Sequence, residues 1–567
     1  MALTGRDAIL NQFLADGFRY MFGNPGTVEQ GLLDALKDHS ELRYILTLQE
    51  SVAVMAADGY ARATRKPALV QIHSTPGLGN SIGALYQAMR GHSPLVVIGG
   101  DAGIRYQAMD AQMAGDLVGM AKPVTKWSTM VEDPSSLLRV IRRAVKIAAT
   151  PPMGPVYVCV PMDILDAPCT EDVFPTSIPN TRSTPEPEAI SEAAKLLANA
   201  QRPVFFIGDG IAYSDAQQEL TRLAELVGAE VWEADAGEVN MDYSHPLYQG
   251  MTGHMFGQNS LPITRKGDVN FICGTYVLPE VFPELGDIFA PDSKVVHVDL
   301  NLYEIAKNHR VDLGLLGDPK STLAKIAAQV ESTLSASQVE HARQRTDKSN
   351  VAKNEKRQAQ VKEDTGARES TPPRMARFVE ELAKKLPSDA ILFDEALTNS
   401  PPITRYLPPS KTSHYFLTRG GSLGVGFPGA IGAKLANPDK TVIGFSGDGG
   451  AMYTIQALWT AARHKTDVKF VVCNNASYKL LQLNIDVYWQ ERSIPKHDFP
   501  LSFDLSHPPL GFVELARGMG VDGVRVDKPE QIEAAIDRAL NHKGPFLIDL
   551  VLEGNVYPER VGNTCGQ

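Results

Sequence analysis

The chain has 567 residues, a length that suits about three or four domains, and its hydrophobic content of 43% is ordinary for a globular protein. A net charge of −11 argues against a broad nucleic-acid-binding surface. No run approaches the roughly 18 apolar residues of a membrane span, the N-terminus lacks a secretory hydrophobic region, and the five cysteines show no C-x-x-C spacing, so we expect a cytoplasmic protein with reduced thiols.

Residues 1–170 alternate helical and strand patterns, which predicts an N-terminal domain with a parallel sheet covered by helices on both faces. The patterns predict helices over 5–16 and 51–63 and strands over 43–48, 68–73 and 94–99. Glycine and proline predict turns at 23–27 (GNPGT) and at 75–80 (TPGLGN).

A proline- and threonine-rich stretch over 166–187 predicts a domain linker. A second α/β pattern follows over 188–334, with strands expected at 203–207, 230–232, 269–273 and 295–298. Residues 335–373 are highly charged and nearly free of large apolar side chains, which is typical of a solvated surface helix or linker. A third α/β pattern occupies 374–550, and a polar tail over 551–567 follows it.

The third pattern contains a strand, a tight glycine turn, a helix and a second strand over 441–475. A βαβ unit makes its two strands parallel, so Asp448 and Asn475, 27 residues apart, are expected side by side at the carboxyl edge of the sheet. Their oxygens suit Mg²⁺, while Gly449 and Gly450 leave the backbone bare for a diphosphate. We therefore predict a metal-bridged diphosphate site.

The same Gly-Asp-Gly tripeptide occurs at 208–210, but the position 27 residues beyond Asp209 is Ala236, with no asparagine pair. We interpret this second tripeptide as an ordinary turn from a strand into a helix.

The paired ends Gly447-Asp448-Gly449-Gly450 and Asn474-Asn475 resemble the GDG…NN signature of thiamin diphosphate enzymes. Further matching stretches are GNPGT at 23–27, QE at 49–50, HSTPGLGN at 73–80 and GGSLGVGFPGAIGAKLA at 420–436. The chain thus resembles the thiamin diphosphate-dependent decarboxylase/lyase superfamily over nearly its whole length, and most closely the benzoylformate decarboxylases. The resemblance implies three doubly wound α/β domains: pyrimidine-binding, central and diphosphate-binding.

The resemblance also implies thiamin diphosphate and Mg²⁺ as cofactors, each cofactor lying between the first domain of one subunit and the last domain of another. A homodimer is then the smallest active unit, often doubled to a homotetramer. The implied metal ligands are Asp448, Asn475 and the main-chain oxygen of Ser477. The implied cofactor-binding residues are Pro25, Thr27, Glu50, Leu397, Thr398, Gly421, Leu423, Gly447, Asp448, Gly449, Gly450, Asn475, Ser477 and Tyr478.

Two residues of the first domain are implied to be catalytic. Glu50 matches the glutamate that exchanges a proton with N1′ of the aminopyrimidine, which generates the imino tautomer and then the C2 ylid. His73 matches the active-site histidine of benzoylformate decarboxylase, and imidazole side chains can relay protons near neutral pH. Without the resemblance, Glu50 would be interpreted as a helix-start acid and His73 as a structural histidine.

Benzoylformate decarboxylase has a second catalytic histidine in its central domain. Our alignment places Val281 at that position of this sequence, and His254 could take over the role from another position. Leu480 and Leu481 could line the substrate pocket, and Glu491 could supply a second catalytic carboxylate, or these residues could be packing and surface positions. The end of the tail, 560–567, is either a lid that closes over the site or a frayed terminus.

We therefore predict a carbon–carbon lyase that decarboxylates 2-oxo acids through an ylid and an enamine, with a small-molecule substrate. The alternatives are a 2-hydroxyacyl-CoA lyase that yields formyl-CoA and an aldehyde or ketone, an acetolactate-synthase-like carboligase, and an inactive scaffold of the same fold. The sequence leaves open whether the central domain binds FAD, ADP, CoA or nothing.

Overall fold

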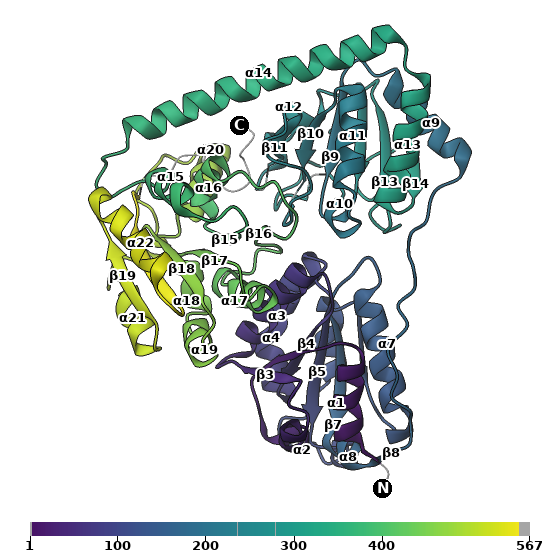
Figure 1. Ribbon diagram of the computed structural model, residues 1–567, viewed down its shortest axis with the longest axis vertical. Helices are drawn as coiled ribbons and strands as arrows, with labels where there is room; N and C mark the ends of the chain where they lie inside the picture. The colour runs from purple at the N-terminus through teal and green to yellow at the C-terminus, as the bar shows by residue number, and fades with distance from the viewer. Residues whose placement is uncertain (1–2, 235, 254, 278, 555–567) are drawn as a thin grey trace.

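The computed structural model describes residues 3–234, 236–253, 255–277 and 279–554. Within these residues the chain forms three six-stranded sheets, each entirely parallel and each with helices packed on its faces (Figure 1). This confirms the predicted α/β class with three doubly wound domains. A short antiparallel pair, β1 (Leu3–Thr4) with β8 (Pro168–Cys169), joins the two ends of the first domain.

The first sheet has the strand order β3-β2-β4-β5-β7-β6. Its strands are β2 (Tyr20–Gly23), β3 (Arg43–Leu46), β4 (Ala68–Ile72), β5 (Leu95–Asp101), β6 (Trp127–Met130) and β7 (Val156–Pro161). The α-helices around it are α1 (Gly5–Ala15), α2 (Gln30–Ala35), α3 (Glu50–Thr64), α4 (Ser74–Arg90), α5 (Ile104–Gln107), α6 (Leu117–Ala121), α7 (Leu137–Ala149) and α8 (Met162–Asp166). A 3₁₀ turn, η1 (Thr27–Glu29), precedes α2.

The turn predicted at 75–80 is wrong, because α4 already begins at Ser74 and contains this stretch. Pro76 lies in the first helical turn, where its missing N–H would have no partner in any case. A Cβ on Gly77 would lie 3.2 Å from Glu50 Oε1, so here glycine serves close packing inside a helix.

The central sheet has the order β11-β10-β9-β12-β13-β14. Its strands are β9 (Pro203–Ile207), β10 (Glu230–Glu233), β11 (Tyr248–Met251), β12 (Val269–Cys273), β13 (Lys294–Asp299) and β14 (Leu313–Leu316), with helices α9 (Pro187–Ala198), α10 (Gly210–Tyr213), α11 (Gln217–Val227), α12 (Leu261–Thr264) and α13 (Pro319–Thr333). Asp209 of the second Gly-Asp-Gly accepts hydrogen bonds from the backbone N–H groups of Gly237 and Glu238, both at 3.0 Å, which agrees with a structural turn.

Most of the charged segment predicted at 335–373 is one helix, α14 (Ala336–Gly366), 31 residues long. It runs along the top of the molecule from the central domain to the third domain (Figure 1). The Lys353 ammonium donates to the carbonyl oxygens of Tyr243 and His245 at 2.6 and 2.7 Å, which ties the polar helix to the central domain.

The third sheet has the order β16-β15-β17-β18-β20-β19. Its strands are β15 (Ile391–Glu395), β16 (Tyr415–Leu417), β17 (Val442–Gly447), β18 (Val468–Asn474), β19 (Asp522–Val526) and β20 (Phe546–Val551). Its helices are α15 (Met375–Lys385), α16 (Ser400–Tyr406), α17 (Gly426–Ala436), α18 (Asp448–Tyr453), α19 (Ala457–Arg463), α20 (Lys479–Glu491), α21 (Phe512–Gly518) and α22 (Ile532–Asn541). The single helix predicted between β17 and β18 is thus two helices, and Thr454 at the break donates its hydroxyl to the Gly424 carbonyl.

Helices α3 and α17 bring the first and third domains together. A Cβ on Gly59 would lie 2.0 Å from the Gly429 carbonyl oxygen, and one on Gly432 would lie 1.9 Å from the Ala56 carbonyl oxygen, so only glycine allows this approach. The buried Arg62 donates to Glu238 Oε1 at 2.8 Å and to the Leu417 carbonyl at 3.0 Å, which adds the central domain to the same junction. No helix in the described part of the chain combines the length and apolarity needed to cross a bilayer.

Candidate functional site

The carboxyl ends of β17 and β18 bring the predicted metal ligands together. The two strands pair in parallel with Gly447 opposite Cys473, and Asp448 and Asn475 follow directly at the same edge of the sheet. This is the juxtaposition expected of a βαβ unit. The amides of Asn475, Ala476 and Ser477 lie close enough to Asp448 to lower its pKa, although burial of the carboxyl dominates and raises that pKa to about 6.

The two oxygens of Asp448 differ in their surroundings. Oδ1 accepts a hydrogen bond from the Gly449 N–H at 2.8 Å, whereas Oδ2 is buried and has no hydrogen-bond partner among the described residues. Buried polar atoms are almost always paired, so an orphaned carboxylate oxygen at a strand end fits a ligand for a hard cation.

Asn475 and Ser477 lie in the turn that follows β18. The side-chain oxygen of Asn475 accepts from the Ser477 N–H at 3.2 Å, and the Ser477 hydroxyl donates to the Phe503 carbonyl at 2.8 Å. Ala476 between them has φ 55°, a left-handed conformation that turns the backbone sharply. The turn therefore holds an amide oxygen and a carbonyl next to Asp448, and the oxygen donors present fit Mg²⁺.

The glycines after β17 leave open space at this edge. A Cβ on Gly449 would lie 2.2 Å from the ring of Tyr478, so the tyrosine packs directly on bare backbone, whereas a Cβ on Gly447 would meet nothing within 4 Å. Gly450 faces the Ser446 hydroxyl. A bulky polar group such as a diphosphate can approach the backbone at Gly447.

Two loops of the third domain lie at neighbouring strand ends. Leu397 and Thr398 form a 3₁₀ turn directly after β15, the strand that pairs with β17. Gly421 and Leu423 lie in the loop before α17, where Gly421 is exposed and has φ 72°. All four predicted cofactor contacts in these loops therefore gather around the same carboxyl edge.

Glu395 at the end of β15 positions the second loop, a role that the sequence did not reveal. Its carboxyl group accepts hydrogen bonds from Gly424 N at 2.5 Å, Gly426 N at 2.8 Å and the Ser446 hydroxyl at 2.9 Å. Burial raises the pKa of Glu395 to about 7. The sequence could have pointed to Glu395 through its position: it ends β15, and β15 pairs with β17, the strand that leads into Asp448.

In the first domain, Glu50 begins α3 and is buried between two asparagine side chains. Asn24 donates to Glu50 Oε1 at 3.3 Å and Asn80 donates to Oε2 at 3.0 Å. Both asparagines belong to the glycine-rich stretches GNPGT and TPGLGN, although neither was predicted to be a site residue. Pro25 and Thr27 are exposed beside Asn24.

His73 follows β4 directly, at the N-cap of α4, and its ring contacts Glu29. The Nδ1 atom lies 3.0 Å from Glu29 Oε2, and the other oxygen of this buried carboxyl accepts from the Gly100 N–H at 3.1 Å. Burial raises the pKa of Glu29, while the His73 ring opposes that shift. A Cβ on Gly26 would lie 2.0 Å from the ring, so glycine is needed for the imidazole to lie there. Glu29 was missed, although it follows Thr27 by only two residues.

Replacing Glu29 with glutamine should lower kcat by about 10- to 100-fold, because a carboxamide has one acceptor oxygen for the two groups that the Glu29 carboxyl now contacts, the Gly100 N–H and the His73 ring, and its NH₂ group would disturb the orientation of the ring. A double-mutant cycle checks this: Glu29→Gln should cost little further activity once His73 is alanine. Glu132→Gln, an exposed acid in the same domain, is the matched control. Equal losses from Glu29→Gln in both backgrounds would refute a role through His73.

The structure does not bring every predicted residue to this edge. Glu491 is exposed at the far end of the 13-residue helix α20, about 20 Å along the axis from its start beside Ser477, so its catalytic role stays a prediction. Val281 is exposed, Leu480 is half-buried and Leu481 is exposed. His254 and residues 560–567 lie outside the described residues.

The two halves of the candidate site belong to different domains. Among the described residues, no hydrogen bond or ion pair joins Glu50 or His73 to the edge that carries Asp448 and Asn475. Each half has its own buried carboxyl group, Glu50 in the first domain and Asp448 in the third.

Models of thiamine pyrophosphate enzymes match all three domains: the N-terminal TPP binding domain over residues 3–120, the central domain over 190–326 and the C-terminal TPP binding domain over 399–550. The chain therefore belongs to the thiamine pyrophosphate enzyme family, which confirms the resemblance. Within that family, its relatives include acetolactate synthases and a benzoylformate decarboxylase.

Two curated relatives are each 30% identical to this chain. They are a probable acetolactate synthase large subunit of Methanocaldococcus jannaschii (97% of this chain, 92% of the relative) and the benzoylformate decarboxylase of Pseudomonas aeruginosa (94% and 96%). A similar solved structure is the thiamine diphosphate-dependent 4-hydroxybenzoylformate decarboxylase of Rhodococcus jostii, with 26% identity, a TM-score of 0.84 and coverage of 98% and 100%.

Proposed function

We propose that this chain is a Mg²⁺- and thiamin diphosphate-dependent decarboxylase of 2-oxo acids, converting R–CO–COO⁻ and a proton into R–CHO and CO₂. The observation that carries the proposal is the pair of titratable groups, Glu50 and the Glu29-held His73, presented on one edge of the first domain. A decarboxylase needs to deliver protons after CO₂ leaves, and a fixed imidazole suits that task.

The residues of the third domain fit the cofactor's metal and diphosphate. Asp448, Asn475 and the Ser477 carbonyl would hold Mg²⁺, and the open backbone at Gly447 would admit the diphosphate. When bound, thiamin diphosphate accepts the electron pair released as the carboxylate leaves. Leu423 and Gly421 would contact the aminopyrimidine side of the cofactor.

The side chains of the first domain would handle protons. Glu50 would hold a proton at N1′ of the aminopyrimidine, with Asn24 and Asn80 keeping its carboxyl group in place. His73 would exchange a proton with the substrate's former carbonyl group.

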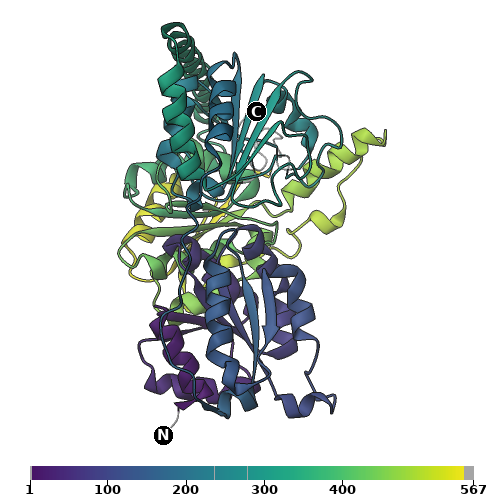
Figure 2. The ribbon, with the colours of Figure 1, turned by 90° about the vertical axis from the view of Figure 1, so that its right-hand side faces the viewer.

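We further propose that a second copy of the chain completes the site, with a homodimer as the minimum and a homotetramer as the full assembly. The support is that, among the described residues, no hydrogen bond or ion pair joins Glu50 or His73 to the edge that carries Asp448 and Asn475. The segment around α20, which projects from the body (Figure 2), begins beside Ser477 and leaves only Trp489 buried along its length. Light scattering on the purified holoenzyme should show a dimer or tetramer; a monomer that retains activity would contradict this proposal.

Carboligation is the second candidate, favoured by the 30% identity to an acetolactate synthase large subunit over 97% of this chain. Decarboxylation and carboligation share their early steps, up to the loss of CO₂. They differ in the step that follows, in which a decarboxylase takes up a proton and a carboligase takes up a second carbonyl compound.

The test is to supply the holoenzyme with benzoylformate, with pyruvate and with a 2-hydroxyacyl-CoA, and to measure CO₂, aldehyde, acetolactate and formyl-CoA. We expect benzaldehyde and CO₂ from benzoylformate in equal amounts. Acetolactate from pyruvate as the main product would favour the carboligase, and formyl-CoA alone would show that the decarboxylase proposal is wrong.

A further inference from the structure

A small cavity of the first domain lies beside the carboxyl group of Glu29. Glu29 and Gln71 are the polar side chains that line it, and they are 2% and 0% exposed. The rest of the lining is apolar or glycine: Ile9, Leu32, Ile98, Gly99, Gly100, Val160 and Leu165. The space has room for about one water molecule and is too small for a substrate.

The side-chain amide of Gln71 supplies a hydrogen-bond donor to this cavity. Its Oε1 atom accepts a hydrogen bond from the Tyr44 hydroxyl at 2.5 Å, and its buried Nε2 atom has no hydrogen-bond partner among the described residues. A Cβ on Gly23 would lie 2.4 Å from the Tyr44 hydroxyl oxygen and 2.9 Å from Gln71 Oε1, so glycine leaves the space for this pair. Burial and the negative charges of Glu29 and Glu50 raise the pKa of Tyr44, which keeps its hydroxyl a donor. Because the amide oxygen is engaged by Tyr44, the NH₂ group is the part of Gln71 that still needs a partner.

The carboxyl group of Glu29 supplies acceptors to the same cavity. Its Oε1 atom accepts from the Gly100 N–H at 3.1 Å, and its Oε2 atom lies 3.0 Å from Nδ1 of His73. An ionised carboxylate has about four acceptor positions on its two oxygens, so these two contacts leave capacity for another donor. A buried donor without a partner and a buried acceptor therefore line one cavity that fits a single water molecule.

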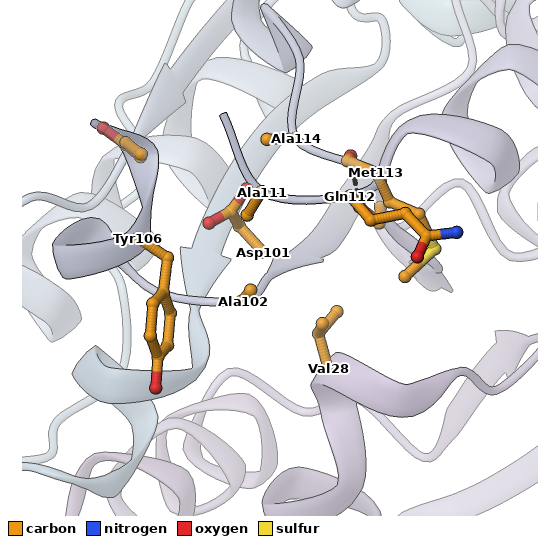
Figure 3. A pocket seen from close by; sticks show the side chains of 10 residues that line it. Val28, Asp101, Ala102, Tyr106, Ala111, Gln112, Met113 and Ala114 are labelled. Carbon is orange, nitrogen blue, oxygen red and sulfur yellow. Dashed lines mark hydrogen bonds between the residues drawn. The ribbon is translucent and has the colours of Figure 1, made fainter. Parts of the chain in front are cut away.

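A second cavity shows that this combination is particular to Glu29 and Gln71. The cavity in Figure 3 is of comparable size, and its lining includes Val28 and Asp101, the sequence neighbours of Glu29 and Gly100. None of the side chains that line it has a buried polar atom without a hydrogen-bond partner. The unpaired Nε2 atom of Gln71 thus marks the cavity beside Glu29 as the one built to hold a polar molecule.

We propose that one buried water molecule joins Nε2 of Gln71 to the carboxyl group of Glu29, and that Gln71 is thereby a positioning residue for His73. The water accepts a hydrogen bond from Nε2 and donates one to a carboxyl oxygen, so that the carboxyl group is fixed by the water as well as by the Gly100 N–H. Buried water molecules typically make two to four such bonds and are costly to remove. The effect on turnover rests on the proposed function, because the position of His73 matters only if its ring moves protons.

The first test is a crystal structure of the Mg²⁺- and thiamin diphosphate-loaded enzyme at about 1.5 Å resolution. We expect a water molecule within about 3.2 Å of both Gln71 Nε2 and a carboxyl oxygen of Glu29. In the Gln71→Met variant, which keeps the length of the side chain without its NH₂ group, this water should be lost and the His73 ring should shift or lose order. A wild-type cavity without electron density for a water molecule would overturn the inference.

The second test measures kcat and KM for the best 2-oxo acid. Gln71→Met should lower kcat by about tenfold with KM within about twofold, because it loosens an acid–base group without touching the substrate. In a His73→Ala background the same change should cost little further activity, which separates an effect through His73 from the loss of the Tyr44 contact. Equal losses of kcat in both backgrounds would show that Gln71 does not act through His73.

The control is Gln12→Met, because Gln12 is also a fully buried glutamine of the first domain. Its side chain bonds to the carbonyl of Phe174 and to Arg142, outside the cavity, so this variant should lose stability and keep kcat within about twofold. Failure of every 2-oxo acid to react would count against the proposed function, and the crystallographic test of the water would still decide the inference.

Discussion

Glu50→Gln is expected to lower kcat by at least about 100-fold while leaving the binding of thiamin diphosphate and Mg²⁺ nearly unchanged. Glutamine matches the shape of glutamate and can still contact Asn24 and Asn80, but it cannot exchange a proton with the aminopyrimidine. General acid–base groups typically contribute 10²- to 10⁴-fold, which sets the size of the loss.

The measurement is kcat for the best 2-oxo acid, together with a calorimetric titration of thiamin diphosphate in excess Mg²⁺. Glu41→Gln, an exposed acid of the same domain, serves as the control and should behave like the wild type. Turnover by Glu50→Gln at the wild-type rate would refute the assignment. Loss of cofactor binding by this variant would instead point to a structural role.

Asp448→Asn should have opposite effects on the metal-free and the cofactor-loaded protein. Burial raises the pKa of Asp448 to about 6, above its ordinary value, so the stabilising contribution of the neutral form is lost as pH rises through 6. At pH 7.5 the metal-free variant should be more stable than the wild type by about 1–3 kcal/mol, since it no longer buries a carboxylate charge whose Oδ2 atom has no hydrogen-bond partner among the described residues. At pH 5 the difference should shrink.

Mg²⁺ and thiamin diphosphate should reverse this order. Ligands that bind only the folded state raise the melting temperature, so the wild type should gain several degrees with both cofactors, whereas Asp448→Asn should gain little and should lose most activity. Thermal melts at both pH values, with and without cofactors or EDTA, provide the measurement. Asp439→Asn, on an exposed acid, is the control. A wild-type cofactor shift retained by Asp448→Asn would show that Asp448 is not a ligand.

Local patterns explain which parts of the site could be predicted. One rule predicted that Asp448 and Asn475 lie together: parallel strands joined by a crossover helix end at the same edge of a sheet. The parallel pairing of β17 with β18 agrees with this rule. The glycine-rich stretches marked the loops around Glu50 and Leu423, and the resemblance assigned roles to residues within them.

Partners that come from distant parts of the chain were missed for a common reason. Glu29 contacts His73 across 44 positions, and Glu395 holds Gly424 and Gly426 across about 30. Neither separation along the sequence matches the period of a helix or a strand. Each contact depends instead on which strand ends become neighbours in a sheet. The turn predicted at 75–80 failed because glycine and proline serve equally well in the first turns of a tightly packed helix.

By itself the sequence determined the three α/β domains and placed Asp448 and Asn475 at one edge of the last sheet, because hydrophobic periodicity and strand–turn–helix order act over short distances. Only the tertiary structure decided that Oδ2 of Asp448 is left without a partner among the described residues, that Glu29 contacts His73, and that Glu395 holds Gly424 and Gly426. Burial and hydrogen-bond pairing depend on atoms brought close by packing, and no short stretch of sequence contains them.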